Sequence, residues 1–306
     1  MTFPNSAEIA RAAALLRAGE LVAFPTETVY GLGANALDEG AVRRIYEVKG
    51  RPPSSPLIVH VDSVAMARTL VSAWPPAADL LAARWWPGPL TLVVPKTPAV
   101  PDCVTAGLPT VGLRVPAHPV ALALIKAAGI PLAAPSANRF TQLSPTTAEH
   151  VRRALGNRVS MILDGGPCDV GIESTVVSLA GPRPVLLRAG ILSREELESV
   201  AGPFGEPDPA GAAHPAPGMH ERHYRPRTPL FLLPCELPPG RGVTLTLNLM
   251  PAGAKAYARA LYARLHELDS EGWDWIAVEP PPPDPEWDGV RDRLSRAACR
   301  PPATAR

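Results

Sequence analysis

Short apolar runs alternate with stretches of helical period from about residue 7 to about residue 200. The runs that predict strands span residues 21–24, 57–61, 90–94, 111–115, 130–134, 161–163, 175–179 and 185–187. The helical stretches span residues 7–18, 39–48, 63–71, 77–85, 118–128, 146–155 and 193–200. Elements that alternate in this way predict a mixed α/β fold, with functional residues at strand ends and in loops.

Local signals refine these elements. Capping boxes are indicated at three helix starts, by Asn5 with Glu8, Thr146 with Glu149, and Ser193 with Glu196. The stretch from Gly31 to Ala36 is predicted to be a glycine-rich turn between the first strand and the helix that follows.

Prolines divide the chain. Many of the 39 prolines cluster between Gly202 and Pro229 and again between Pro280 and Pro285. The first cluster predicts a linker over residues 203–229, which separates a domain of residues 1–202 from a small α/β domain of residues 230–306. In the second domain, strands are predicted at 230–233, 243–249 and 275–278, and helices at 254–268 and 289–298.

Composition excludes several classes of protein. With 46% hydrophobic and 19% charged residues and a net charge of +1, the chain has no global field that attracts nucleic acid or membranes. No apolar run approaches the ~18 residues of a membrane span, and the first helix carries charges that a signal peptide lacks. The four cysteines are isolated, which indicates free thiols in a reducing cytoplasm.

Two segments indicate an anion site. Pro25 to Ala36 combines hydroxyls and glycines directly after an apolar run, and Lys49-Gly50-Arg51-Pro52 places two cations before another strand. Open backbone donors, hydroxyls and a Lys/Arg pair suit a phosphorylated ligand. As isolated features, Lys49 and Arg51 are more often solvated surface charges.

Other readings of single residues stay open. Arg114 in its apolar strand either lines a cavity or faces bulk water, and Arg188 closes another strand in the same way. His60 lies within an apolar strand, where a hydrogen-bonded core histidine is the commoner outcome.

Common catalytic motifs are absent from the sequence. Gly31-Leu32-Gly33-Ala34-Asn35-Ala36 has the spacing of a dinucleotide fingerprint, but no long helix follows at once and no acidic residue stands ~20 positions on. There is also no Walker motif, no Ser/His/Asp pattern and no metal-ligand spacing.

Six ordered motifs together resemble one family. They are Pro25 to Gly33, Lys49-Gly50-Arg51-Pro52 with Pro56 to His60, Trp86 to Thr91, Arg114-Val115-Pro116, Ala134 to Asn138, and Ile172 to Val176 followed by Leu187-Arg188. This order resembles the YrdC/Sua5 family of L-threonylcarbamoyladenylate synthases over residues ~7–200. The linker at Pro217–Pro226 and the small second domain are similar to the longer, two-domain Sua5 type.

The resemblance implies both a fold and a reaction. It implies a twisted, curved mixed sheet with helices, and a Rossmann-like C-terminal domain. The family joins L-threonine, bicarbonate and ATP into threonylcarbamoyl-AMP and pyrophosphate. A separate transferase then uses the product to form threonylcarbamoyladenosine in tRNA. Mg²⁺ is expected to accompany ATP, with no metal site built from protein side chains.

The resemblance also implies a set of binding residues. The threonine pocket corresponds to Thr28, His60, Arg114, the backbone at Ala134, and Ser174. The ATP contacts correspond to Lys49, Arg51, Ser55, Thr110, Ser136, Asn138, Ser144, Arg188 and Tyr224. Lys49 and Arg51 are the candidates for catalytic charge stabilisation, and no general base is assigned.

Two departures from the family pattern stand out. Phe140-Thr141 occupies the place where the family usually has Ser-Gly, and His220-Glu221 replaces the usual Lys-Tyr before Arg222-His223-Tyr224. Because Tyr224 is kept, we expect the linker to fold back over the nucleotide as a lid. A flexible tether is the alternative.

Two other functions are compatible with these residues. One is a double-stranded RNA or tRNA-binding module, because the resemblance implies a large basic concave face, which fits at least a weak RNA contact. The other is carbamoyl transfer to a different acceptor. The related hydrogenase-maturation proteins that do this carry zinc-finger and acylphosphatase segments, which this sequence lacks.

Overall fold

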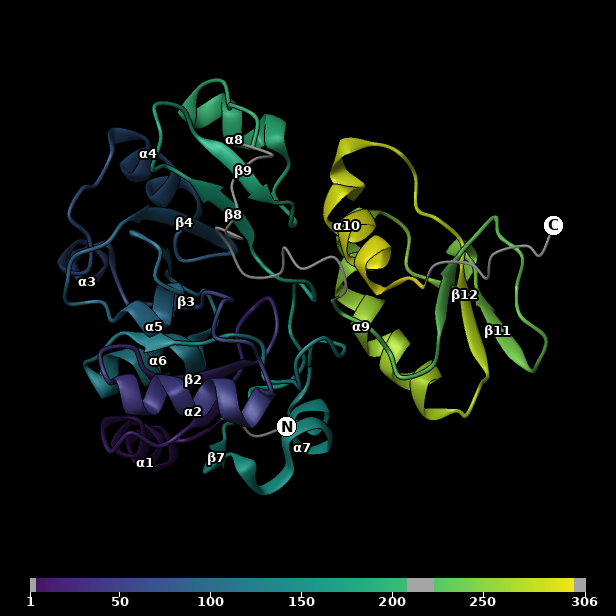
Figure 1. The fold of residues 1–306 in the computed structure, drawn as a ribbon, viewed down its shortest axis with the longest axis horizontal. Helices are drawn as coiled ribbons and strands as arrows, with labels where there is room; N and C mark the ends of the chain where they lie inside the picture. Colours follow the sequence, from purple (N-terminus) through teal and green to yellow (C-terminus); the bar gives the residue numbers. More distant parts are fainter. Residues whose placement is uncertain (1–3, 208–222, 300–306) are drawn as a thin grey trace.

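The structure is a computed structural model, which describes residues 4–207 and 223–299. Two sheets, each accompanied by helices, lie side by side (Figure 1). The larger sheet is built from residues 22–188 and the smaller one from residues 230–278. The predicted boundaries at 202 and 229 stay predictions, and most of the linker lies outside the described residues.

The larger sheet has nine strands in the order β7-β1-β2-β6-β3-β5-β4-β8-β9. They are β1 (Val22–Phe24), β2 (Gly31–Asn35), β3 (Ile58–His60), β4 (Leu90–Pro95), β5 (Thr110–Arg114), β6 (Leu132–Ala133), β7 (Met161–Ile162), β8 (Thr175–Ser178) and β9 (Val185–Arg188). The sheet contains both parallel pairs, such as β3 with β5, and antiparallel pairs, such as β8 with β9. The predicted mixed sheet is confirmed.

Helices surround this sheet (Figure 1). They are α1 (Ser6–Arg17), α2 (Glu39–Lys49), α3 (Val64–Thr69), α4 (Pro76–Trp85), α5 (Asp102–Thr105), α6 (Pro119–Ala128), α7 (Ala148–Leu155) and α8 (Arg194–Ala201), with a 3₁₀ turn η1 (Gly156–Arg158). Helix α5 has no counterpart among the predicted helices, because its four residues are too few for a periodic signal.

Two of the three predicted capping boxes form, at the starts of α1 and α8. The third prediction is wrong by one residue. The hydroxyl of Thr147 accepts the backbone N–H of His150 and caps α7, whereas the N–H of Thr146 donates to the His150 ring. Thr146, which was expected to cap the helix, is therefore bonded to the His150 ring instead.

The predicted glycine-rich turn is instead strand β2, which pairs with β1 and β6. A β-carbon at Gly33 would stand 2.7 Å from the ring of Phe24. Glycine therefore lets β2 lie flat against a buried aromatic side chain, which residue composition alone does not reveal.

The smaller sheet has three parallel strands in the order β10-β12-β11. Its elements are β10 (Leu230–Leu232), β11 (Gly242–Leu245), η2 (Leu247–Leu249), α9 (Ala254–Ser270), β12 (Trp275–Val278), η3 (Pro285–Trp287) and α10 (Asp288–Ala297). This confirms the predicted second α/β unit. Helices α9 and α10 stand between the two sheets (Figure 1).

The two units share one hydrophobic core. Val29 and Ile172, from loops of the larger unit, belong to the same buried cluster as Tyr262 of α9 and Leu294 of α10. The contact is close, because a β-carbon at Gly171 would lie 2.5 Å from the carbonyl oxygen of Ala258. The second unit is thus packed against the loops that carry the sequence motifs.

Candidate active site

Loops at the ends of β1, β3, β5, β6, β8 and β9 enclose a cavity of about 50 Å³. Its lining brings together the first motif, the lysine–arginine motif, the arginines of β5 and β9, and residues 223 and 224. Cationic side chains from separate loops therefore converge on one hollow.

Arg114 is buried and lines this cavity, which settles the question that its strand left open. Its guanidinium donates to the Glu27 carboxylate at 2.6 Å, to the Thr28 hydroxyl at 2.9 Å and to the Gly88 carbonyl at 3.1 Å. A guanidinium has five N–H groups, so these contacts hold it rigidly while two remain to face an anion.

His60 is buried at the same wall of the cavity and stacks edge-on against Phe24. Its Nδ1 has no hydrogen-bond partner among the described residues. His60 is thus a buried core histidine with one ring nitrogen left without a partner in the described chain. Burial, reinforced by the charge of Arg114, lowers the pKa of His60 well below its ordinary value, so the ring is neutral.

Arg51 also lines the cavity, and Lys49 lies directly behind it. The Lys49 ammonium donates to the carbonyls of Ser136 at 2.5 Å and Asn138 at 2.6 Å. Arg51 donates to the hydroxyl of Ser55 at 2.5 Å. Burial, followed by the mutual repulsion of the two cations, lowers the pKa of Lys49 well below its ordinary value. Burial lowers the pKa of Arg51 to about 10.

Arg188 and Ser174 line the cavity as a bonded pair. The Arg188 guanidinium donates to both the carbonyl and the hydroxyl oxygen of Ser174, each at 3.1 Å. The Ser174 hydroxyl also lies 2.8 Å from that of Thr91 on β4. Burial lowers the pKa of Arg188. The hydroxyl and the guanidinium are therefore fixed relative to each other.

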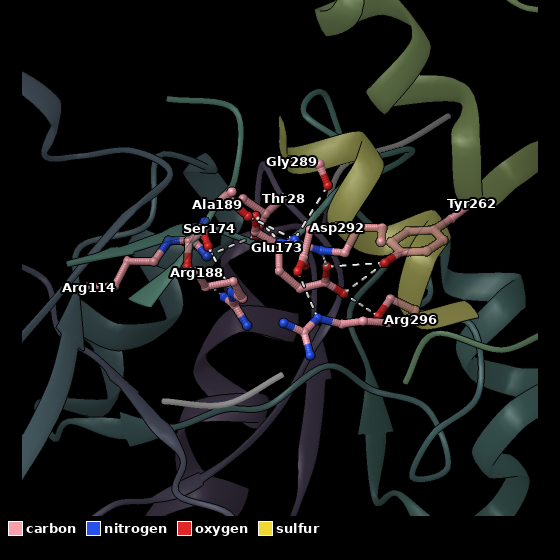
Figure 2. A network of polar contacts seen from close by, with 12 residues as sticks. Thr28, Arg114, Glu173, Ser174, Arg188, Ala189, Tyr262, Gly289, Asp292 and Arg296 are labelled. Atoms are coloured by element: carbon pink, nitrogen blue, oxygen red, sulfur yellow. Dashed lines mark hydrogen bonds and ion pairs between the residues drawn. The ribbon is translucent and has the colours of Figure 1, made fainter. Parts of the chain in front are cut away.

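Glu173 connects the part of the site around Ser174 and Arg188 to the second unit (Figure 2). Its carboxylate accepts hydrogen bonds from the hydroxyls of Ser144 and Tyr262 and from Arg293 of α10 at 2.7 Å. Burial alone would raise the pKa of Glu173, but Arg293 and Arg188 hold it below its ordinary value. The carboxylate is therefore charged.

Arg293 also binds the backbone at two places next to the cavity residues, Ala189 and Glu173. It is fully buried and donates to the carbonyls of Ala189 at 2.8 Å and Glu173 at 3.1 Å. These residues directly adjoin Arg188 and Ser174. A side chain of the C-terminal unit thus positions two residues that line the cavity.

Residues 223 and 224, which lead into the second unit, also line the cavity. Tyr224 is buried beneath Arg293, whose guanidinium carbon lies 5.2 Å from the ring centroid, and the Tyr224 hydroxyl has no partner among the described residues. His223 packs edge-on against Phe140, at 5.7 Å between ring centroids. Phe140 in turn lies 5.7 Å from the Arg51 guanidinium carbon. Phe140, which departs from the family pattern, therefore connects His223 to Arg51.

Residues 14–190 match the Sua5/YciO/YrdC family model, described as "Telomere recombination", and residues 192–299 match the model of the threonylcarbamoyl-AMP synthase C-terminal domain. The chain belongs to the Sua5/YrdC family. The resemblance found in the sequence is thereby confirmed, in its two-domain form.

Relatives agree with this family assignment. Threonylcarbamoyl-AMP synthase of Bacillus subtilis is 42% identical over 96% of this chain and 94% of its own length. The enzyme of the same name from Pyrococcus abyssi is 50% identical over 72% of this chain and 66% of its own length. The crystal structure of P. abyssi Sua5 complexed with L-threonine superposes with a TM-score of 0.91 at 39% identity, covering 97% of this chain and 96% of that one.

Most of the Sua5/YrdC motif residues meet at the cavity. Its lining includes nine of the predicted site residues: Thr28, Arg51, His60, Arg114, Ala134, Ser136, Ser174, Arg188 and Tyr224. Lys49, Ser55 and Ser144 do not line the cavity, but each contacts a residue that does. Asn138 contacts Lys49 and lies one step further back. Thr110 lies at the other end of β5, roughly 13 Å from Arg114 along the strand, and does not line the cavity. The individual roles stay predictions.

Three residues of the site were not singled out from the sequence. Glu27 and Glu173 lie inside the quoted motifs, and an acidic residue beside a hydroxyl in each was an available signal. Arg293 belongs to an ordinary amphipathic helix in the second unit, and nothing in its local sequence marks it. Only the packing of the two units reveals it.

Proposed function

We propose that this protein is an L-threonylcarbamoyl-AMP synthase. The reaction joins L-threonine, bicarbonate and ATP to give threonylcarbamoyl-AMP, pyrophosphate and water. The observation that carries the proposal is the convergence of Arg51, Arg114 and Arg188 on one cavity, with Lys49 directly behind it. The second reactant besides an amino acid is polyanionic, and this surplus of buried cations matches it.

The threonine half is proposed to lie against Arg114. Its two remaining N–H groups form a fork for the substrate carboxylate, while Thr28, His60 and Ser174 offer polar groups around it. The structure of P. abyssi Sua5 complexed with L-threonine supports threonine as the amino-acid substrate. The neutral His60 ring accommodates a substrate without adding a second charge.

The ATP half is proposed to lie against Lys49, Arg51 and Arg188. Burial lowers the pKa of all three, because no carboxylate neutralises them fully inside the protein. A triphosphate supplies the missing negative charge. The carboxylates of Glu27 and Glu173 are already paired with arginines. Mg²⁺ would therefore be held by phosphate oxygens and water, and arrive with the nucleotide.

The proposed chemistry depends on positioning and charge. The amine of threonine takes up bicarbonate carbon with loss of water to form a carbamate. A carbamate oxygen then attacks the α-phosphorus of ATP, and pyrophosphate leaves. Holding two mutually repelling reactants in line corresponds to effective molarities of up to ~10⁵–10⁸ M. Each charge-assisted contact contributes roughly 1.5–3 kcal/mol. We assign no general base.

We propose that residues 223 and 224 act as a lid. Ligand sites usually enclose about 300–1,000 Å³, whereas the cavity beneath Tyr224 has about 50 Å³. Two ligands of the size of threonine and ATP would fit if residues 223 and 224 moved outward. The part of the linker at residues 208–222, to which the lid prediction also refers, lies outside the described residues.

The product is a mixed anhydride, and we propose that a separate tRNA threonylcarbamoyl transferase consumes it in the cytoplasm. None of the helices in residues 4–207 and 223–299 has the length and apolar character needed to span a bilayer. RNA binding as the main function is not favoured, and at most a weak RNA contact is expected.

The deciding experiment measures pyrophosphate release from ATP by the full chain. Release is expected only when both L-threonine and bicarbonate are present, and serine or valine should replace threonine poorly. Release without threonine, or equal rates with unrelated amino acids, would refute the proposal. Steeply salt-dependent RNA binding without threonine-dependent turnover would instead favour an RNA-binding module.

A further inference from the structure

A second hollow lies outside the active cavity, where the two units meet. It has a volume of about 520 Å³ and is lined by residues of α7, η1, the loop of residues 139–143, the segment 225–227 and the end of α9. Helices α7 and α9 are labelled in Figure 1. The rings of His150 on α7 and His266 on α9 stack across this junction, with 3.9 Å between their centroids. We call this hollow the junction groove.

The junction groove concentrates positive charge. Five arginines line it: Arg139, Arg153, Arg158, Arg225 and Arg227. The whole chain carries a net charge of only +1, so this accumulation is local. A concave surface lined by one sign of charge focuses its field on the ligand space.

The protein neutralises this charge only partly. Among the described residues that line the groove, Asp269 alone carries a carboxylate. This carboxylate already accepts hydrogen bonds from Arg227 at 3.2 Å and from the backbone N–H of Thr228 at 2.8 Å. Within the described chain, no ion pair involves Arg139 or Arg158. Arg153 pairs with Glu149 at 3.1 Å on an exposed helix surface.

Arg225 gives an independent sign of a missing partner. Its Nη2 donates to the Ala298 carbonyl at 2.7 Å, but its Nε is buried and has no acceptor among the described residues. An unpaired buried donor on a charged group costs free energy, which an anionic ligand in the groove would offset.

We propose that the junction groove binds a compact polyphosphate, such as inorganic pyrophosphate or the phosphate tail of a nucleotide, separately from the active cavity. Guanidinium forks match the geometry of phosphate oxygens. The arginines line one hollow from four segments rather than forming a row along the surface, which favours a compact anion over a nucleic-acid backbone.

The groove is physically continuous with the loop behind the active cavity. A smaller hollow of about 340 Å³ shares Arg139, Gln142 and Arg158 with it and reaches Lys49. The carbonyl of Asn138, which precedes Arg139, accepts from the Lys49 ammonium. A polyphosphate in the groove would thus contact Arg139, in the loop whose carbonyl oxygen at Asn138 holds the Lys49 ammonium.

The test is equilibrium dialysis of radiolabelled pyrophosphate against the full chain at low ionic strength. Two classes of site are expected in the wild type. The variant Arg139→Glu/Arg158→Glu should weaken one class by about tenfold or more, because it replaces two attractive contacts by repulsive ones. Arg51→Ala should weaken the other class, in the active cavity. Both groove arginines are exposed, so we expect the variant to fold, and Arg158→Gln provides a milder change.

The matched control is Arg84→Glu/Arg183→Glu, which makes the same change of charge at two exposed positions outside the groove. It should leave both classes of site intact. Unchanged pyrophosphate binding in the groove variants, or an equal loss in the control, would overturn the proposal. So would a result in which the groove variants lose only the binding of an RNA duplex.

Discussion

Arg114 shows how one side chain depends on its buried partners. The Arg114→Ala variant should raise the KM for threonine by roughly tenfold or more and leave ATP affinity largely intact, because only the carboxylate contact is lost. The measurement is threonine- and ATP-dependent pyrophosphate release together with direct ATP binding.

Truncation of Arg114 also leaves Glu27 as an unpaired buried carboxylate. Glu27→Gln in the same chain removes this charge and provides the control for folding. If both ligands were lost equally in the double variant, the assignment of Arg114 to threonine would be contradicted.

Thr141 carries backbone strain beside the cation loop. Its φ is +69°, in the left-handed region, and its carbonyl accepts the N–H of Arg225 at 2.7 Å. A non-glycine residue there costs about 1–2 kcal/mol, whereas glycine adds about 0.5–1 kcal/mol of chain entropy. Thr141→Gly should therefore stabilise the protein by up to about 1 kcal/mol in urea unfolding. Clear destabilisation would show that the threonine side chain contributes contacts worth more than the strain.

Helix α10 acts on the site through a single buried arginine. Arg293→Met should lower the free energy of unfolding by about 3–5 kcal/mol, because it leaves the Glu173 carboxylate buried without its closest cation. It should also raise the KM for threonine, because the backbone beside Ser174 and Arg188 loses its anchor.

Two variants test this account of α10. Glu173→Gln combined with Arg293→Met should recover part of the stability, since no charge is then left alone. Arg291→Met, on the same helix but partly exposed, should cost less than about 1 kcal/mol. If Arg293→Met unfolded at the same urea concentration as the wild type with an unchanged KM, α10 would have no positioning role.

At the scale of the whole molecule, buried histidines set the dependence of stability on pH. Burial lowers the pKa of His60, His118, His150, His223 and His266, that of His150 to about 3. Below about pH 6.5 these histidines are protonated in the unfolded chain but stay neutral in the folded chain. The free energy of unfolding therefore falls as the pH drops.

Each such histidine contributes up to about 1 kcal/mol per pH unit in this window. Urea unfolding at pH 7.5, 6.5 and 5.5 should therefore show a stepwise loss of stability, above the range in which most carboxylates titrate. A constant free energy of unfolding across this range would mean that the histidines gain protons in the folded state.

The second unit and the residues that lead into it should matter for activity as a whole. A chain that ends at residue 202 loses Tyr224, Arg293 and the cluster around Tyr262. We expect it to fold, since the nine-stranded sheet is complete, but to release pyrophosphate slowly. Full activity in this truncation would refute the lid.

Much of the architecture could be predicted from local patterns. The first capping box, the helix at 39–49 and the β8–β9 hairpin follow from periodicity and turn residues, which act over a few residues. Strand β2 was missed because its glycines resemble a turn until Phe24 is placed against them. The capping residue of α7 was displaced by the ring of His150, which is also a contact of tertiary origin.

The sequence by itself determined the family and the motifs that meet at the cavity, because those residues are fixed by local chemistry at strand ends. Only the tertiary structure decided that Arg114 faces the cavity and that His60 keeps an unpaired nitrogen. The same holds for the arginine of α10 behind Ser174 and for the arginine-lined groove between α7 and α9. These features depend on packing between segments far apart in the chain, such as Glu173 and Arg293, which are 120 residues apart, and no local pattern records such contacts.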